Sequence, residues 1–581
     1  MRRMPVCFLA LLGFLSQGLL LSQKQGPSLE RASQAFRAGT DAYAKGDLAE
    51  ADRQFSRAVQ LAPAIEEGHS ALGVVLCAQG KYPQAIAELK TALKLNPGDR
   101  NAEENLAQAY SQTGAVDKAV ALFHSMDREM PLSAELLAMW ARDLAAVPNT
   151  AAAIDVMSRA VATDPHNSEL DDQLGSLDAQ AGRWPEAETA FRQAIAIDAG
   201  LASAHIHLAV VLSHEQQTGR AETEFATAAQ LDPRSATVQL EWGNALVTAS
   251  EDEQAISHFR QAVALDPDQL DAEYQLGLAL QRAGKEEEAI PLFQRVVNAR
   301  PQQAEPLTNL GLAMVQTGHA KEAIPLYRRA AAIAPQNATI YEDLGAAYLQ
   351  ENNIDDAIRE LNTGLRLAPQ DPHLHYDLGL AFKLKDDLPH AIAELERALQ
   401  LDPQSPDAPY TLGILYMQSG HFDDAVRNLR AALELRPQNG DGWSILGSIY
   451  RQQGKYDEAS AALKKAIELV PKQPGPHITL ASVLQEEGKQ DEAMAERKKA
   501  ADLTRVAVNR QRAMFATNAG NALLGKGAIA DAIAHYQEAI TSDPNYAEAH
   551  RQFAAALLQQ GRVTEAATER QKADALAAKN P

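Results

Sequence analysis

Apolar and polar residues follow helical spacing along this chain, in pairs of short segments separated by a glycine turn. On both sides of Gly46, Gly80 and Gly114, apolar positions return every three or four residues. This spacing predicts a helix, a tight turn and a second helix. No segment alternates with a period of two, so the sequence predicts no strand. The chain is therefore expected to be all-α.

The predicted helix pairs return every 34 residues. Proline marks this register from Pro63 to Pro471, with Ala199 as the one exception. A fixed period of this length indicates one small unit stacked many times. With the proline at position 32, the first unit is Ala32–Ile65, and about sixteen units reach Asn580.

Three other positions predict how the two helices of one unit pack. Position 8 is glycine in eleven units and alanine in five, and position 20 is alanine in all sixteen. Position 24 is mostly large and apolar, as at Phe55 and Leu361. Small residues at positions 8 and 20 let the helices approach closely, and the large residue at position 24 fills the remaining space. The proline lies past the second helix and ends it.

This combination of positions resembles the tetratricopeptide repeat, and the resemblance covers Ala32 to Asn580. It implies a right-handed α-solenoid, a superhelix of about sixteen 34-residue helix-turn-helix units. It also implies that the first helix of each unit lines a concave groove. Members of this family bind peptides or protein segments in that groove and rarely catalyse reactions.

Two units depart from the pattern in the manner of terminal repeats, which need a polar outer face. The fourteenth unit, Pro474–Ala507, carries Arg497 at position 24, and the sixteenth carries Arg570 there. We infer that the fourteenth unit once ended the array. Units 1–14 then occupy residues 32–507, and units 15–16 occupy residues 513–580.

Five additional residues, 508–512, separate the fourteenth and fifteenth units. Neither proline nor glycine occurs between Gln490 and Ala519. Since these residues are the strongest helix breakers, the sequence predicts one long helix from about Asp491 to Leu524 that joins the two units.

Residues 1–22 have the layout of a secretory signal peptide. A short basic start containing Arg2 and Arg3 precedes an apolar run over residues 6–21 and then polar residues. Sixteen residues make a short membrane span. We therefore expect an exported protein, periplasmic or extracellular; the alternative is a membrane anchor formed by residues 6–21. Cleavage would remove Cys7 and leave Cys77 alone, so no internal disulfide is expected.

Charge and motif content exclude several classes of function. The formal net charge of −22 argues against nucleic acid as a partner, because phosphate binding needs clustered Lys and Arg. No phosphate loop, nucleophile motif or zinc-type cysteine spacing occurs. Five histidines fall at position 4, which indicates a preference of the repeat rather than a metal site. We expect no catalysis, no cofactor, no metal and no small-molecule substrate.

Candidate partner-binding residues lie at positions that the resemblance places in the groove. Tyrosines at position 5 offer amphipathic contacts to a peptide, and amides can both donate to and accept from an extended backbone. The glutamines at position 13 have an alternative role as residues that suit a helix end. The candidates are Tyr274, Tyr376, Tyr410, Asn244, Gln316, Gln350, Gln418 and Gln452. The Lys/Asn clamp of family members that bind chaperone tails is missing.

The segment around residues 497–512 is the only strongly basic stretch of this acidic chain. It is either a solvated helix face or a docking patch for an acidic partner or a membrane surface. Its cations are Arg497, Lys498, Lys499, Arg505, Arg510 and Arg512.

These features together predict a non-catalytic adaptor that binds protein partners or peptide segments along the groove. One alternative is a structural component of an envelope assembly. Another is an accessory subunit of secretion or glycosyl-transfer machinery.

Overall fold

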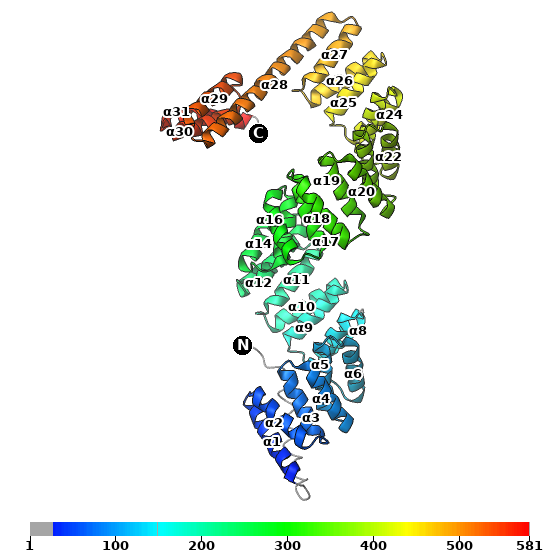
Figure 1. The fold of residues 1–581 in the computed structure, drawn as a ribbon, viewed down its shortest axis with the longest axis vertical. Helices are drawn as coiled ribbons and strands as arrows, with labels where there is room; N and C mark the ends of the chain where they lie inside the picture. Colours follow the sequence, from blue (N-terminus) through cyan, green and yellow to red (C-terminus); the bar gives the residue numbers. More distant parts are fainter. Residues whose placement is uncertain (1–26, 148, 580–581) are drawn as a thin grey trace. The chain divides into compact units, whose positions relative to one another are not determined.

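The computed structural model describes residues 27–147 and 149–579, and all regular secondary structure in these ranges is helical (Figure 1). The chain divides into two compact parts, each built of several 34-residue repeats. We call them the first unit, which ends at Ala299, and the second unit, which begins at Arg300, and from here on a single 34-residue element is called a repeat. The predicted signal peptide, residues 1–22, lies outside the described residues.

The first unit contains α1 to α16. Their bounds are α1 Pro27–Ala44, α2 Leu48–Leu61, α3 Glu66–Ala78, α4 Tyr82–Leu95, α5 Arg100–Gln112, α6 Val116–Glu129, α7 Ala134–Ala146, α8 Thr150–Thr163, α9 Ser168–Gln180, α10 Trp184–Ile197, α11 Ala202–His214, α12 Thr218–Leu231, α13 Ala236–Thr248, α14 Asp252–Leu265, α15 Leu270–Arg282 and α16 Glu286–Ala299.

The second unit contains α17 to α31. Their bounds are α17 Ala304–Gln316, α18 Ala320–Ile333, α19 Ala338–Gln350, α20 Ile354–Leu367, α21 Pro372–Leu384, α22 Leu388–Leu401, α23 Asp407–Gln418, α24 Phe422–Leu435, α25 Gly440–Gln452, α26 Tyr456–Leu469, α27 Pro474–Glu486, α28 Gln490–Gly525, α29 Ile529–Ser542, α30 Ala547–Gln559 and α31 Val563–Lys579.

The helix bounds follow the 34-residue register closely. Most first helices begin at position 1 of the repeat, and second helices from α4 to α26 run from position 17 to position 30. The first helix, α1, is an exception because it begins at Pro27, five residues ahead of Ala32. The proline at position 32 lies two residues past the second helix, as Pro63 does after Leu61. It ends that helix without opening the next one.

Position 15 turns the chain between the two helices of a repeat. In the fifteen repeats where the structure describes this residue, its φ is positive, and in eleven of them it is glycine, such as Gly80 with φ 73°. The turn is closed by backbone hydrogen bonds: Gly80 N–H donates to the Cys77 carbonyl at 2.9 Å and Lys81 N–H to the Leu76 carbonyl at 2.8 Å. This is the usual glycine ending of a helix, because glycine adopts a positive φ without steric cost.

The core of each repeat is a close approach of its two helices, as positions 8, 20 and 24 predict. A β-carbon added at Gly73 would lie 2.5 Å from Leu89, and one at Gly345 would lie 2.6 Å from Leu361. The alanines at position 20 are buried in every repeat, from Ala51 to Ala566. Position 24 therefore fills the space that the missing side chain at position 8 leaves.

Where position 4 is histidine, its side chain joins the two helices of the repeat and, in four of five cases, the connection that precedes them. Five histidines there place Nδ1 2.5–2.6 Å from a glutamate oxygen of the second helix, 19 residues later. In four of them Nε2 lies 3.0–3.3 Å from the carbonyl of the residue six positions earlier. The pairs are His69–Glu88, His205–Glu224, His375–Glu394, His477–Glu496 and His550–Glu569. These histidines are structural, which explains their recurrence at one position.

Within each unit the helices form two layers. First helices of neighbouring repeats contact each other, as α3 contacts α5 and α19 contacts α21. Each second helix contacts its own first helix and the first helix of the next repeat, as α18 contacts α17 and α19. The first helices of a unit therefore share one surface, which we call the first-helix layer.

The second unit contains one helix that breaks this regularity. The 36-residue α28 serves as the second helix of the fourteenth repeat and as the first helix of the fifteenth. It packs against α27 in one repeat and against α29 and α30 in the next (Figure 1). The predicted long helix is present, and its bounds differ from Asp491–Leu524 by one residue at each end.

Candidate peptide-binding surface

The first-helix layer of the second unit carries a strip of partly exposed apolar side chains. Position 9 contributes Leu312, Leu380 and Ile414, and position 12 contributes Leu349 and Met417. All five are half-buried, although the residues beside them at position 8 are buried. We call this set the apolar strip. Recurring partial exposure on one layer of a solenoid is the arrangement that such proteins use for extended binding surfaces.

Two of the candidate tyrosines lie on neighbouring first helices of this layer. Tyr376 on α21 is half-buried and packs against the cluster around Leu395 and Leu412. Tyr410 on α23 is also half-buried, and burial together with the charge of Asp441 raises the pKa of its hydroxyl. Each ring is thus held by its own repeat with part of its surface accessible.

The candidate glutamines of the second unit all occupy the last residue of a first helix and are exposed. They are Gln316, Gln350, Gln418 and Gln452. In α21 the same position is Leu384, which is 57% exposed. These amides therefore border the apolar strip at the edge of the layer where the first helices end and the turns begin. Their position also suits a helix end.

The other two candidates belong to the first unit. Asn244 on α13 is half-buried, and its side-chain N–H donates to Glu241 at 3.4 Å. Tyr274 on α15 is half-buried against Phe293, with ring centroids 6.0 Å apart. Both side chains thus contribute to local packing of the first unit.

The second unit also brings together three carboxylates that motif reasoning missed. Glu342 and Asp343 lie on α19 at positions 5 and 6, and Asp377 lies on α21 at position 6. No described residue forms an ion pair with any of the three. We call them the carboxylate cluster. Aspartate occurs at position 6 in these two repeats alone, which is the one sequence feature that could have found them.

Burial and the nearby like charges raise the pKa values of all three groups in the carboxylate cluster. Burial raises the pKa of Asp343 to about 7, and the charges of Glu342 and Asp377 add to the shift. Burial also raises the pKa of Asp377 to about 7, with Glu342 adding to it and His373 opposing it. The pKa of Glu342 is raised by burial and by Asp371. Like charges held together in a partly desolvated place favour the neutral acid or a bound cation.

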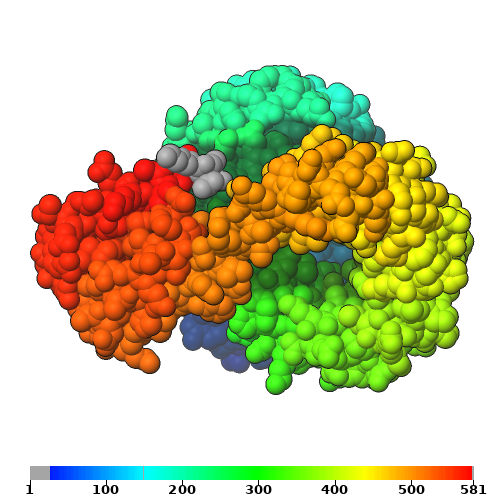
Figure 2. Space-filling model, turned by 90° about the horizontal axis from the view of Figure 1, so that it is seen from above, coloured from blue at the N-terminus to red at the C-terminus, as the bar shows by residue number. Residues whose placement is uncertain are grey.

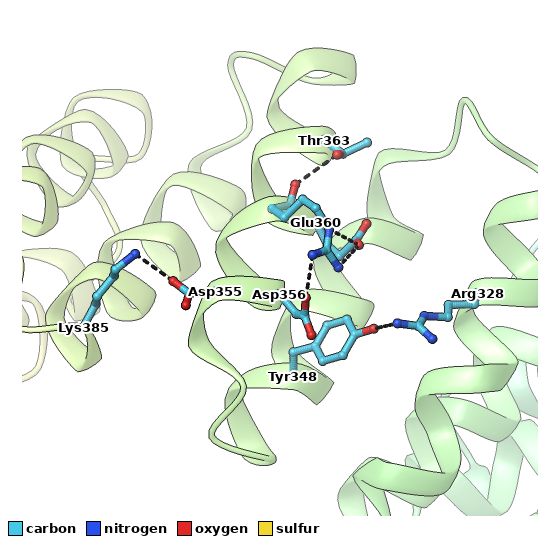
Figure 3. A network of polar contacts seen from close by, with 8 residues as sticks. Arg328, Tyr348, Asp355, Asp356, Glu360, Thr363 and Lys385 are labelled. Carbon is cyan, nitrogen blue, oxygen red and sulfur yellow. Dashed lines mark hydrogen bonds and ion pairs between the residues drawn. The ribbon is translucent and has the colours of Figure 1, made fainter.

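Charges on the outer side of the same repeats behave differently, because they are paired (Figure 3). Lys385 donates to Asp355 at 2.7 Å across neighbouring repeats, and Arg359 contacts both Asp356 and Glu360. The Arg328 guanidinium donates to the hydroxyl of Tyr348 on the next helix. Hydrogen bonding to Lys385 lowers the pKa of Asp355. The carboxylate cluster thus lacks the cationic partners that Asp355 and Asp356 have.

The structure separates the six predicted basic residues of α28 into two groups. Arg510 binds Asp543 and lies over the ring of Tyr546, 5.0 Å from its centroid, so it fastens α28 to the following hairpin. Lys499 pairs at 2.7 Å with Glu496, which also holds His477. Lys499 is itself exposed, as are Arg497, Lys498, Arg505 and Arg512, so Arg510 differs from the other five.

The described parts of the chain contain surface depressions between helices. One is lined by α11, α12 and α13 beside Trp242, another by α6, α7 and α8 beside Trp140, and a third lies along α27 and α28. Within residues 27–147 and 149–579, no three metal-binding side chains gather as a metal site would need. No helix in these ranges has the length and apolarity required to cross a bilayer.

Comparison with known proteins agrees with the repeat register. Sequence models of the tetratricopeptide repeat match residues 76–142, 268–336, 314–378 and 410–474. A model described as TPR repeat matches residues 243–284, 384–420 and 520–576. No curated protein sequence matches the chain significantly.

Solved structures that resemble this chain include the Cut9–Hcn1 hetero-tetramer of APC/C, at 17% identity and a TM-score of 0.40, covering 91% of this chain and 97% of that one. MamA matches at 25% identity and a TM-score of 0.27, over 28% of this chain and 94% of its own. YrrB, a TPR protein with an unusual peptide-binding site, matches at 21% identity and a TM-score of 0.29, over 32% and 95%.

The repeat register, the close helix pairs and the matches along both units lead to one conclusion. This chain is an α-solenoid of the tetratricopeptide repeat family.

Proposed function

We propose that this chain is a non-catalytic scaffold that binds a peptide or protein segment on the first-helix layer of its second unit. One observation carries the proposal: the carboxylate cluster lacks cationic partners on the same layer that exposes the apolar strip. Strongly shifted carboxyl groups at an accessible surface mark candidate functional sites. The tetratricopeptide fold, which typically serves in protein interaction, supports this assignment.

The chemistry of the surface indicates the kind of segment that fits. Apolar side chains of the ligand would cover Leu380, Ile414 and Met417, and the rings of Tyr376 and Tyr410 would contact both apolar and polar groups. A Lys or Arg of the ligand would neutralise the carboxylate cluster, which removes the repulsion between its charges. The glutamines at the turn side supply donors and acceptors for a peptide backbone. The predicted ligand therefore combines apolar residues with at least one cation.

Selection from a displayed library of random peptides tests this proposal. The full chain should enrich sequences that contain Lys or Arg beside apolar residues. Asp343→Asn/Asp377→Asn should remove the preference for the cation, and Tyr376→Ala/Tyr410→Ala should weaken all selected peptides. The matched control is Asp355→Asn/Asp356→Asn, which removes two carboxylates from the outer side and should leave selection unchanged.

Two results would contradict the proposal. One is enrichment without any cation preference by the unmodified chain. The other is an equal loss of binding in the outer control, since that would indicate a general effect of charge rather than a site on the first-helix layer.

We also propose that the scaffold acts after export, on the basis of the signal-peptide layout of residues 1–22. Protein sequencing of the mature amino terminus from the source cells tests this. A start within residues 19–23 would agree with cleavage, because the notional cleavage positions follow Gly18 and Ser22. An intact Met1 in an exported fraction would instead favour the anchor formed by residues 6–21.

A further inference from the structure

The fourteenth repeat presents a face that other repeats bury. In a regular repeat, the large residue at position 24 lies buried against the glycine at position 8, as Phe55 and Phe293 do. In some repeats it also stacks on the next first helix, as Phe225 does on Trp242. In the fourteenth repeat this position is Arg497, which is exposed. Ile478 at position 5 of α27 is 53% exposed, whereas Tyr376 and Tyr410 are half-buried at the same position. The place of a neighbouring first helix is therefore vacant here.

The vacancy arises because α28 continues straight on. Residues of its middle segment are open to solvent, including Val506 and Val508, which are 60% and 41% exposed. In Figure 2 this helix, coloured orange, extends from the yellow repeats to the red hairpins. The following first helix is thus carried away from the face that it would otherwise cover.

This α27–α28 face combines an apolar centre with a cationic rim. Ile478 from α27 and Val508 from α28 line its depression, together with Arg497, Arg505 and Arg512. On α28 the residues 497, 501, 504, 508, 512 and 515 recur at helical spacing, so they share one side of the helix. Phe515 extends this side and is 67% exposed.

The sixteenth repeat has a charged side chain where the fourteenth has an apolar one. Its position 5 is Arg551, which pairs with Glu548 in the same helix. The α27–α28 face has Ile478 at that position and exposes apolar side chains instead. Its arginines are only partly engaged: Arg497 donates to the Gln485 amide, and Arg505 pairs with Asp502 at 2.9 Å. Within the described ranges Arg512 forms no ion pair.

We propose that the α27–α28 face binds an acidic amphipathic helix of a partner protein. Around Ile478 and Arg497 the face corresponds to the surface next to which the following first helix lies in a regular repeat, and residues 504–512 of α28 extend it by further helical turns. An elongated surface of this kind fits a helix. An apolar stripe of that helix would cover Ile478 and Val508. Carboxylates on either side of the stripe would meet Arg497, Arg505 and Arg512, whose planar guanidinium groups bind carboxylates in a fixed geometry.

A membrane surface is a poorer match for the same residues. The arginines surround a depression formed by two helices, which a helical ligand can enter and a flat lipid surface cannot. The net charge of −22 also opposes approach of the whole chain to anionic lipid. The charge complementarity of this one basic stretch therefore favours a protein helix.

The proposal is tested with the full chain and two synthetic helical peptides that differ only in charge. Both carry one leucine stripe, flanked by glutamates in the first peptide and by glutamines in the second. Fluorescence anisotropy should show tighter binding of the glutamate peptide, and added salt should reduce the difference. Reversing three charges with Arg497→Glu/Arg505→Glu/Arg512→Glu should weaken binding of that peptide by about tenfold or more.

A matched triple variant controls for overall charge. Arg430→Glu/Lys464→Glu/Lys472→Glu reverses three exposed cations on neighbouring repeats and should leave the affinity unchanged. Ile478→Glu tests the apolar centre separately and should also weaken binding. Protection of amides in residues 497–512 by the bound peptide would support the location.

Four results would overturn the proposal. The first is equal binding of the two peptides, and the second is equal loss in the control triple variant. The third is binding to vesicles of phosphatidylcholine and phosphatidylserine with no binding of the glutamate peptide, which would assign the face to a membrane. The fourth is self-association that the Arg triple variant abolishes, with no peptide binding, which would assign it to a second copy of this chain.

Discussion

The residue at position 15 determines the conformational free energy of the turn that links the two helices of a repeat. Glycine adopts the positive φ there without steric cost. In four of the described repeats another residue adopts it, with φ between 56° and 63°: Gln216, Ser250, Asn352 and Asp386. Asparagine and aspartate tolerate this region better than other side chains. Gln216 and Ser250 therefore carry backbone strain that a glycine would relieve.

Gln216→Gly is expected to stabilise the first unit by about 0.5–1 kcal/mol, because the left-handed conformation costs a non-glycine residue roughly that amount or more. Gly318→Ala in the second unit makes the opposite change at the same position, φ 82°, and should destabilise by a similar amount. Urea denaturation of the full chain measures both. A loss of stability in Gln216→Gly would show that its side chain contributes more than its backbone costs.

The carboxylate cluster has a pH dependence whose sign follows from its raised pKa values. Asp343 and Asp377 titrate near pH 7 in the folded chain, against an ordinary value of 3.8. Between these values the folded state binds more protons than the unfolded state, so the free energy of unfolding falls as the pH rises from about 4 to 7.

Asp343→Asn/Asp377→Asn should therefore raise the Tm at pH 8, where the wild-type carboxylates repel each other. The advantage should shrink as the pH falls and be small near pH 4, where the wild-type groups are protonated in the folded state and about half protonated in the unfolded state. Thermal unfolding at pH 8, 6 and 4 measures it. Asp355→Asn is the control, since its carboxyl is exposed and its pKa is lowered, not raised. A gain that is constant across pH would contradict the assignment.

At the scale of elements, stability resides in the contact between the two helices of one repeat. Position 20 lies where they approach most closely, and Ala357 is fully buried there on α20. Nearby, Gly345 on α19 receives the side chain of Leu361, so little free space remains around this contact.

Ala357→Leu should separate α19 from α20 and cost about 1–3 kcal/mol, the usual penalty for added methylenes in a packed core. The melting curve of the full chain measures this. Ala332→Leu, on the exposed side of α18, adds the same side chain without a packed neighbour and should change stability little. An unchanged melting curve for Ala357→Leu would mean that the two helices are loosely packed.

The long helix α28 depends on different forces along its length. Its ends are packed on α27 and on α29, but residues 501–508 are largely exposed. Where tertiary contacts are few, a helix relies on the low stability of its own backbone hydrogen bonds. Amides of residues 501–508 should thus exchange with solvent faster than those of residues 513–520, which mass spectrometry of deuterated peptides would show. Equal protection along α28 would contradict this.

At the scale of the whole chain, sequence reasoning predicted the repeat architecture because its packing contacts recur within each 34-residue period. Glycine at position 8, alanine at position 20 and proline at position 32 together fix the helix bounds. The absence of proline and glycine was sufficient to predict α28. The family itself is shown by matches in both units.

The candidate surface could be predicted less completely, because its properties depend on contacts between repeats. The pKa of Asp377 depends on Glu342, which lies 35 residues earlier on the neighbouring first helix, α19. No local sequence pattern reveals this proximity. Likewise Arg510 and Arg512 look alike in sequence, but Asp543 from a later hairpin pairs only with Arg510. Whether the predicted tyrosines and glutamines bind a partner stays a prediction.

The contact between positions 8 and 24 has a consequence for the length of the whole chain. The close pair of positions 8 and 24 lies inside one repeat, and where position 24 also contacts the next repeat, as Phe225 contacts Trp242, the contact is with the next first helix. Excising residues 372–405 would bring α23 against α20 with the same kinds of side chain on both sides. The chain can thus be shortened or lengthened in 34-residue steps, and evolution could adjust its reach without redesigning its interior.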